Sequence, residues 1–220
     1  MSAALLLLLA LQAPLDEGTL VVREDTAEVA RESFRLMSGH EAGGVMWTLA
    51  STSRYERRRP MLVLAPILEV AGDSQPSNLE FDVANPISPS RILGQASRGR
   101  FTVRQLGRGT ERAREIPVSG RVVVLDDSVY ALYLFAAWAA GPRPATITGI
   151  VPRAARRDTL TVQDLGPAAT TLHGDPVTLR HTSVSGGPNR QVDVWLDDGG
   201  RLVKVEIPSR RVRVERLSSP

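Results

Sequence analysis

The sequence predicts a mainly β protein in which a long antiparallel meander forms a strongly curved sheet or half-barrel, with one buried helix at about residues 127–140. Most apolar residues after position 19 recur with a period of two, and Gly, Pro and Asp separate these runs. One segment near the middle interrupts this period with a nearly continuous apolar run. A long meander has to pair into two sheets or curl, and one apolar helix would fill the concave side of a curved sheet.

Period-two runs cover the chain on both sides of this helix. Before the helix the predicted strands are residues 20–22, 29–36, 44–56, 61–70, 78–85, 100–106, 114–120 and 121–126. After it they are residues 145–151, 158–165, 170–174 and 176–184. Pro66 lies inside the fourth run and has no N–H to donate to a ladder, so we expect an edge strand or a bulge there.

The stretch from Gln191 to Glu215, "QVDVWLDDGGRLVKVEIPSRRVRVE", predicts three strands with their turns. Aliphatic residues alternate with other types along each run, and they are Val192, Val194, Leu196, Val203, Val205, Ile207, Val212 and Val214. The turn "DDGG" at residues 197–200 supplies the Asp and Gly that a tight hairpin needs. This alternation is typical of an antiparallel sheet with one buried and one solvated face.

The segment "DDSVYALYLFAAWAAGPRP" carries the predicted helix. Its first residues, Asp-Asp-Ser at 126–128, suit an N-terminal cap. Residues 129–140 are then mostly apolar, and Gly141 followed by Pro142 is a typical helix end. Because apolar side chains would surround this helix, we expect it to be buried on most sides. It is too short to span a bilayer, so we expect no transmembrane helix in the mature chain.

The first residues predict export. "MSAALLLLLALQAPLDEG" is apolar from Ala3 to Leu11 and then turns polar, as the start of a secretory signal does. We therefore expect a signal peptide at residues 1–13, a single β-rich domain at residues 14–220, and a location in the periplasm or cell envelope. The alternative is an apolar first strand or helix of a cytosolic protein. The sequence contains no cysteine, which excludes a lipid-anchored lipoprotein.

The charge pattern does not predict a nucleic-acid partner. The formal net charge is +3, and Lys204 is the single lysine among the 27 basic residues. Arginine clusters at residues 57–59, 153–157 and 210–211 lie far apart in the sequence and lack interleaved aromatic residues. Nucleic-acid binding would require basic residues gathered on one face together with stacking aromatics. We interpret these arginines as solvated turns and strand faces.

No motif predicts catalysis or a metal. His40, His173 and His181 are the three histidines, and their spacing is not that of a metal site. The string "SVSGG" at residues 183–187 has the wrong frame for the nucleophile elbow of a serine hydrolase. Asp126 and Asp127 could act as an acid–base pair, but we interpret them as helix-capping residues. The sequence thus predicts a non-enzymatic protein with no catalytic residue, no metal and no cofactor.

The order of these elements resembles that of uncharacterised bacterial envelope proteins of the DUF3108/DUF6134 type, which are distantly similar to LolA/LolB-like lipoprotein carriers. The resemblance spans most of the mature chain and includes the "LDDSVYALYLFAAWA" helix and the "VDVWLDDGGRLVKVEI" hairpin. The residues that match the hairpin motif are Trp195, Asp197 or Asp198, Gly200, Leu202 and Val203. The resemblance implies a half-barrel with a helix over its open side and an apolar cavity between them. It implies no catalytic residue.

Several aromatic residues lie on the predicted helix or in a long predicted strand. The residues that would line such a cavity and bind a ligand are Trp47, Tyr130, Tyr133, Phe135 and Trp138. Tyrosine hydroxyl and tryptophan N–H groups would supply the polar contacts of a mostly apolar site. If the cavity does not exist, the same residues are core residues.

Two main hypotheses follow. In the first, the chain is an exported, non-enzymatic envelope protein that binds or carries a lipid-like or other apolar ligand between sheet and helix. In the second, it is a structural or interaction module with a solid core and no ligand, and it meets another envelope protein. An envelope enzyme is a third, less supported hypothesis.

Overall fold

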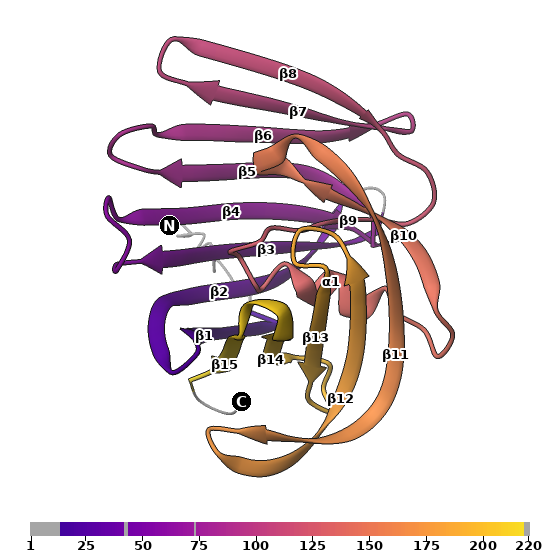
Figure 1. Cartoon of the computed structure of the whole chain (residues 1–220). Coiled ribbons are helices and arrows are strands. Elements are labelled where there is room, and N and C mark those ends of the chain that lie inside the picture. The colour runs from indigo at the N-terminus through magenta and orange to yellow at the C-terminus, as the bar shows by residue number, and fades with distance from the viewer. Residues whose placement is uncertain (1–13, 42–43, 73, 218–220) are drawn as a thin grey trace, which may run out of the picture.

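The computed structural model describes residues 14–41, 44–72 and 74–217. In these residues fifteen strands form one long, curved, unclosed sheet (Figure 1). The strand order across the sheet is β8-β7-β6-β5-β4-β3-β2-β1-β15-β14-β13-β12-β11-β10-β9. The prediction of a mainly β protein built from a strongly curved antiparallel meander is confirmed.

The sheet has an N-terminal and a C-terminal half. The N-terminal half contains β1 (Asp16–Glu24), β2 (Ala27–Glu41), β3 (Gly44–Tyr55), β4 (Leu62–Ala71), β5 (Pro76–Ala84), β6 (Ser90–Ser97), β7 (Arg100–Gly107) and β8 (Thr110–Pro117). The C-terminal half contains β9 (Val122–Val124), β10 (Ala145–Val151), β11 (Arg156–Leu172), β12 (Asp175–Gly186), β13 (Gln191–Leu196), β14 (Leu202–Ile207) and β15 (Val212–Arg216). The helical elements are α1 (Tyr133–Trp138) and the 3-10 turns η1 (Pro152–Ala154) and η2 (Pro208–Arg210).

The first and last strands meet in the middle of the sheet. β1 pairs antiparallel with β15, with Leu20 opposite Arg216. The Arg216 guanidinium is buried and pairs with the carboxylate of Asp16, with Nη2 2.7 Å from Oδ1. A buried charge is tolerated when it is paired, so this ion pair accompanies the backbone ladder that joins the two halves.

The sheet wraps back on itself without closing. Its outermost strands are β8 and β9. Among the described residues, the β9–β10 pair is the one parallel pair. The curvature carries η1 over the concave face of β7. There Gln105 Nε2 donates to the carbonyl oxygens of Pro152 and Arg153, at 3.1 and 2.9 Å. Figure 1 shows this turn lying in front of the N-terminal strands.

The middle of the chain fills the concave side of the sheet. Residues 122–126, 128–137 and 139 are buried, and most of them belong to one hydrophobic core with the inner faces of both halves. Phe34 and Phe81 contribute to this core from the N-terminal half, and Leu160 and Val194 from the C-terminal half.

The helix is shorter than the sequence predicted. α1 has six residues, whereas residues 127–140 were expected. Its N-cap is Leu132, which makes no side-chain cap hydrogen bond, so the prediction that Asp126, Asp127 and Ser128 cap the helix is wrong. Residues 127 and 128 form a bend, in which the Ser128 N–H donates to the Asp126 side chain. The N–H groups of Tyr130 and Ala131, further along, donate to the distant Glu32.

Of the edge strand or bulge expected at Pro66, the edge strand is also wrong. β4 lies between β3 and β5 in the interior of the N-terminal half. On the β3 side, residue pairing is interrupted between Ile67 and Leu64, which accommodates the missing N–H of Pro66. The three strands expected in residues 191–215 are present as β13, β14 and β15.

The expected signal peptide at residues 1–13 lies outside the described residues. Within the described ranges, no helix has the length and apolar character needed to cross a bilayer.

Candidate functional site

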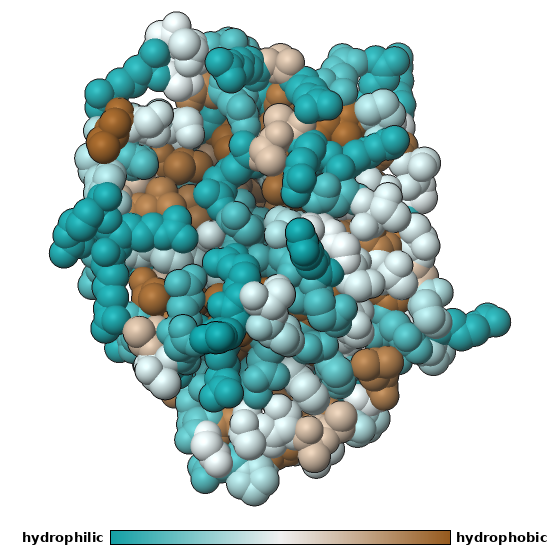
Figure 2. All heavy atoms as spheres, in the orientation of Figure 1, coloured by the Kyte–Doolittle hydropathy of each residue, from teal (hydrophilic) through white to brown (hydrophobic). Residues whose placement is uncertain are grey.

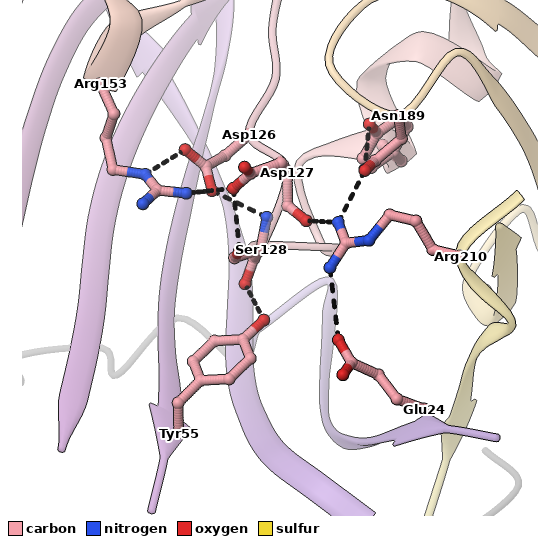
Figure 3. A network of polar contacts seen from close by, with 9 residues as sticks. Glu24, Tyr55, Asp126, Asp127, Ser128, Arg153, Asn189 and Arg210 are labelled. Atoms are coloured by element: carbon pink, nitrogen blue, oxygen red, sulfur yellow. Dashed lines mark hydrogen bonds and ion pairs between the residues drawn. The ribbon is translucent and has the colours of Figure 1, made fainter. Parts of the chain in front are cut away.

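The turn at residues 126–128 is held by side chains from several separate parts of the fold (Figure 3). Tyr55 at the end of β3 donates its hydroxyl to the carbonyl oxygen of Ser128, at 2.7 Å. Within the turn, the Ser128 N–H donates to Asp126 Oδ1 at 2.9 Å, and the Ser128 hydroxyl donates to Asp127 Oδ1 at 2.8 Å.

Two arginines from similar turns hold this segment from two sides. η1 and η2 each begin with a proline, and each is followed by a residue with positive φ, Ala155 after η1 and Arg211 after η2. From η1, Arg153 donates through Nε and Nη2 to both carboxylate oxygens of Asp126, at 2.6 and 2.7 Å, and it also contacts the Asp127 carboxylate. Such a bidentate guanidinium–carboxylate pair fixes the turn in orientation as well as position.

The second arginine continues the network toward α1. From η2, Arg210 Nη1 donates to the backbone carbonyl of Asp127 at 2.7 Å and to Asn189 Oδ1 at 2.8 Å. Asn189 is buried and donates through Nδ2 to the Tyr133 hydroxyl at 3.0 Å. The network therefore connects the turn, the loop before β13 and the first residue of the helix.

The pKa values of the Asp126 and Asp127 carboxyl groups are shifted in opposite directions. Burial raises the pKa of Asp126, and this desolvation outweighs the hydrogen bond and charge of Arg153. Burial also opposes ionisation of Asp127, but the charge of Arg153, the Ser128 hydroxyl and Arg210 together lower its pKa. Because Arg153 occupies both Asp126 oxygens, this carboxyl is arranged for structure rather than for proton transfer to a ligand.

Glu32 on β2 is a buried acid that the sequence analysis did not single out. Its Oε2 accepts the Tyr130 N–H at 2.7 Å, and its Oε1 accepts the Ala131 N–H at 3.0 Å and the Ser51 hydroxyl at 2.7 Å. The side chain is fully buried, and burial raises its pKa despite these three donors. A signal was present in the sequence, because Glu32 shares its strand face with Phe34 and other core residues.

The five aromatic residues predicted to bind a ligand belong to the packed interior or its margin. Tyr130, Tyr133 and Phe135 are at most 2% exposed and are members of the hydrophobic core. Trp47 and Trp138 are partly buried and pack against it, with their ring centroids 5.8 Å apart in an edge-to-face arrangement. Phe135 makes a similar contact with Trp138 at 5.6 Å. Their role in ligand binding stays a prediction.

An open groove lies where η1 faces the concave side of β5–β8, and its volume is about 410 Å³. Its apolar lining is Val83, Ile87, Pro89 and Ile92. Its charged lining is basic: Arg108, Arg112 and Arg153. Figure 2 shows apolar surface over β4 and β5, bordered by hydrophilic atoms, beside the loop that joins β5 to β6.

The shape of the groove follows from local interactions. Ile92, Gln105 and Arg112 lie opposite one another on β6, β7 and β8, so they form one cross-strand row. At the rim, the Asn85 side chain accepts the N–H of Ile87 at 2.9 Å, and Ile87 remains 73% exposed. Arg112 was not among the predicted site residues, although its face of β8 is the one that carries the buried Ile116.

A second depression of about 470 Å³ is less suited to an apolar ligand. Its charged lining has both signs and consists of Glu28, Arg31, Arg54, Glu56 and Arg57. Glu28 and Arg31 already form an ion pair with 2.7 Å between Oε1 and Nε. The groove beside η1 combines more apolar lining with charge of one sign, and we take it as the candidate site. Among the described residues, no group of three or more His, Cys, Asp or Glu side chains could hold a metal ion.

No protein-family model matches the chain, and no curated protein matches its sequence. One solved structure is similar: a crystal structure of a β-barrel-like protein of domain of unknown function DUF1849 from Brucella abortus, with a TM-score of 0.56 and 12% sequence identity. The match covers 92% of this chain and 95% of that chain. It shows a shared β-barrel-like fold of uncharacterised function, and it does not specifically support the DUF3108/DUF6134 or LolA-like resemblance.

Glu32 gives a testable pH dependence. We expect the stability advantage of the parent over a Glu32→Gln variant to fall as the pH rises above about 4.5, the ordinary pKa of the group. Between the unfolded-state and folded-state pKa values, the folded protein retains the Glu32 proton and the unfolded chain has lost it. The stability that this group contributes is therefore fully present below the unfolded-state pKa, and it is lost as the pH rises through the folded-state pKa. Urea unfolding of both proteins between about pH 4 and pH 8 measures this difference, whose slope is at most about 1.4 kcal/mol per pH unit.

Glu17→Gln, at an exposed acid of β1, serves as the matched control for removing one carboxyl group. An advantage of the parent over Glu32→Gln that stays constant or grows with pH would contradict the proposed protonation behaviour.

Proposed function

We propose that this chain is an exported, non-enzymatic protein of the bacterial envelope that binds or carries a lipid-like or other apolar ligand. The groove between η1 and β5–β8 is the observation that most supports this proposal. Its volume of about 410 Å³ falls within the range of about 300–1,000 Å³ that is typical of small-molecule sites. It combines apolar walls with a few polar groups, as such sites do.

The proposed ligand position differs from the one expected from the sequence. A ligand between α1 and the sheet would have to displace side chains such as Tyr130, Tyr133 and Phe135, which are packed in the core. A ligand in the groove needs no such displacement, because the groove is already open and borders the network through Arg153. We therefore place the ligand in the groove.

The resemblance to DUF3108/DUF6134-type proteins and LolA/LolB-like carriers is part of this proposal. It supports an apolar ligand by analogy, through the order of elements and the hairpin at β13 and β14. The similar DUF1849 structure is described as a domain of unknown function and adds no ligand.

A structural or interaction module is the second candidate function. The packing of Tyr130, Tyr133 and Phe135 favours it, because a solid core needs no ligand to complete it. In that case the partner would be another envelope protein. Ligand binding in the groove separates the two candidates.

Export is tested by the mass of the mature chain. We expect a bacterium that expresses the native N-terminus to accumulate, outside the cytoplasm, a chain that begins near Pro14, because the apolar residues up to Leu11 suit a secretory signal. Intact-mass spectrometry of the fractionated protein measures this start. An unprocessed chain beginning at Met1 in the cytosolic fraction would contradict export.

Ligand binding is tested first with a neutral amphiphile, so that charge plays no part. We expect dodecyl maltoside below its micelle concentration to bind one site, and Ile87→Asn to weaken binding about three- to tenfold, since partly burying an isoleucine contributes on the order of 1 kcal/mol. Isothermal titration calorimetry measures both affinities. Lipid extraction of the purified protein followed by mass spectrometry gives an independent readout.

Ile67→Asn is the matched control, because Ile67 is an exposed isoleucine, 44% accessible, on the opposite face of the sheet in β4. Equal weakening by both substitutions would place binding outside the groove. Absence of any binding, with no lipid in the extract, would leave the interaction module as the better candidate.

A further inference from the structure

The arginines on the two faces of β6–β8 differ in their partners. On the outer face, Arg104 on β7 pairs with Glu111 on β8, with Nη2 2.6 Å from Oε1. Arg100 on β7 pairs in the same way with Glu115, and Arg91 on β6 pairs with Glu80 of β5. The outer face thus neutralises its positive charge through cross-strand pairs.

The groove side shows the opposite arrangement. No ion pair or hydrogen bond within the described residues engages the guanidinium of Arg108 or Arg112, and no acidic residue lines the groove. Arg114 lies two residues further along the same face of β8 as Arg112 and is exposed. The third lining arginine, Arg153, is already neutralised by Asp126 and Asp127.

This uncompensated charge borders apolar surface. Arg108 and Arg112 line the groove together with Ile87, which is exposed, and Val83 and Pro89, which are partly exposed. Arg108 lies in the β7–β8 turn, at the same side of the groove mouth as the loop that presents Ile87. A guanidinium binds a carboxylate or phosphate through two parallel N–H···O bonds, and water exclusion by adjacent apolar groups strengthens that interaction. A ligand with an anionic head and an apolar chain could bind the two arginines and the apolar lining at the same time.

We propose that the groove selects a single-chain amphiphile with an anionic carboxylate or phosphate head, which Arg108 and Arg112 bind while the chain lies against Val83, Ile87 and Pro89. This inference rests on the proposed function and specifies the ligand class for the same groove. Because Arg153 is occupied by its two aspartates, it positions the groove wall and does not bind the head.

The test compares ligands that share one twelve-carbon chain. Dodecanoate, dodecyl phosphate, neutral dodecyl maltoside and cationic dodecyltrimethylammonium are titrated below their micelle concentrations into the full-length mature protein by calorimetry. We expect the two anions to bind at least about tenfold more tightly than the neutral ligand, as for hydrogen bonds to charged groups. A preference for dodecanoate over dodecyl phosphate would indicate a fatty acid, and the reverse preference a phospholipid-type head. Added salt should weaken the binding of the anions.

Arg112→Gln should remove most of the preference for anions, measured as the ratio of the dodecanoate and dodecyl maltoside affinities within the same variant. Arg104→Gln is the matched control, because Arg104 is an exposed arginine on the outer face of the neighbouring strand. Both positions are exposed, and the unfolding midpoint of each variant shows whether it remains folded.

The outcomes separate this inference from the proposed function. Equal affinity for anionic and neutral ligands, or an unchanged preference in Arg112→Gln, would overturn the inference and leave an apolar-ligand protein. Inorganic phosphate binding as tightly as dodecyl phosphate would overturn the amphiphile and indicate a site for free anions. Failure of every amphiphile to bind would overturn both proposals.

Discussion

The carboxyl group of Glu32 and the main chain of residues 130–131 make the contact on which the interior of this protein depends. A curved sheet alone leaves a concave apolar face, and the segment that fills it must leave helical geometry and turn within the core. The N–H groups freed in that turn would be costly to bury without acceptors. Glu32 accepts two of them, and Arg153 and Arg210 fix the neighbouring carboxylates and carbonyl from two hairpin turns.

This arrangement separates packing from binding. The aromatic residues expected to line a cavity are used to fill the concave side, and the apolar surface that remains open lies further along the sheet, under η1. Gln105 holds η1 there by donating to two of its carbonyls, while Arg153 points from the same turn into the interior network. One short turn therefore forms the wall of the groove and completes the clamp on residues 126–128.

Much of the sheet could be predicted from the sequence, because strand periodicity is local. The alternation of aliphatic residues with other types in residues 191–215 correctly predicted three strands. The helix boundaries could not be predicted in the same way. Glu32 lies 98 residues from Tyr130 in the chain, so the acceptor that ends the helical run is not visible near that run.

The candidate site shows the same limit. Strand alternation alone could have shown that Glu32 and Arg112 point to the inner face of the sheet. Glu32 shares its face of β2 with the apolar Phe34, and Arg112 shares its face of β8 with the apolar Ile116. The groove itself could not be derived, because it requires η1 to cross β7 through contacts between residues 47 and 48 positions apart. The seam between β1 and β15, which brings Asp16 to Arg216, likewise depends on the closure of the whole meander.

Contact quenching distinguishes a ligand in the groove from a ligand beside the helix. Bromine at the end of an amphiphile chain quenches tryptophan fluorescence only at close range, and none of the three tryptophans lines the groove. If the ligand binds in the groove, 12-bromododecanoic acid should show saturable binding by calorimetry while the tryptophan emission stays unchanged. Saturable quenching that is reduced in Trp138→Phe would show that the chain lies beside the helix and would contradict binding in the groove.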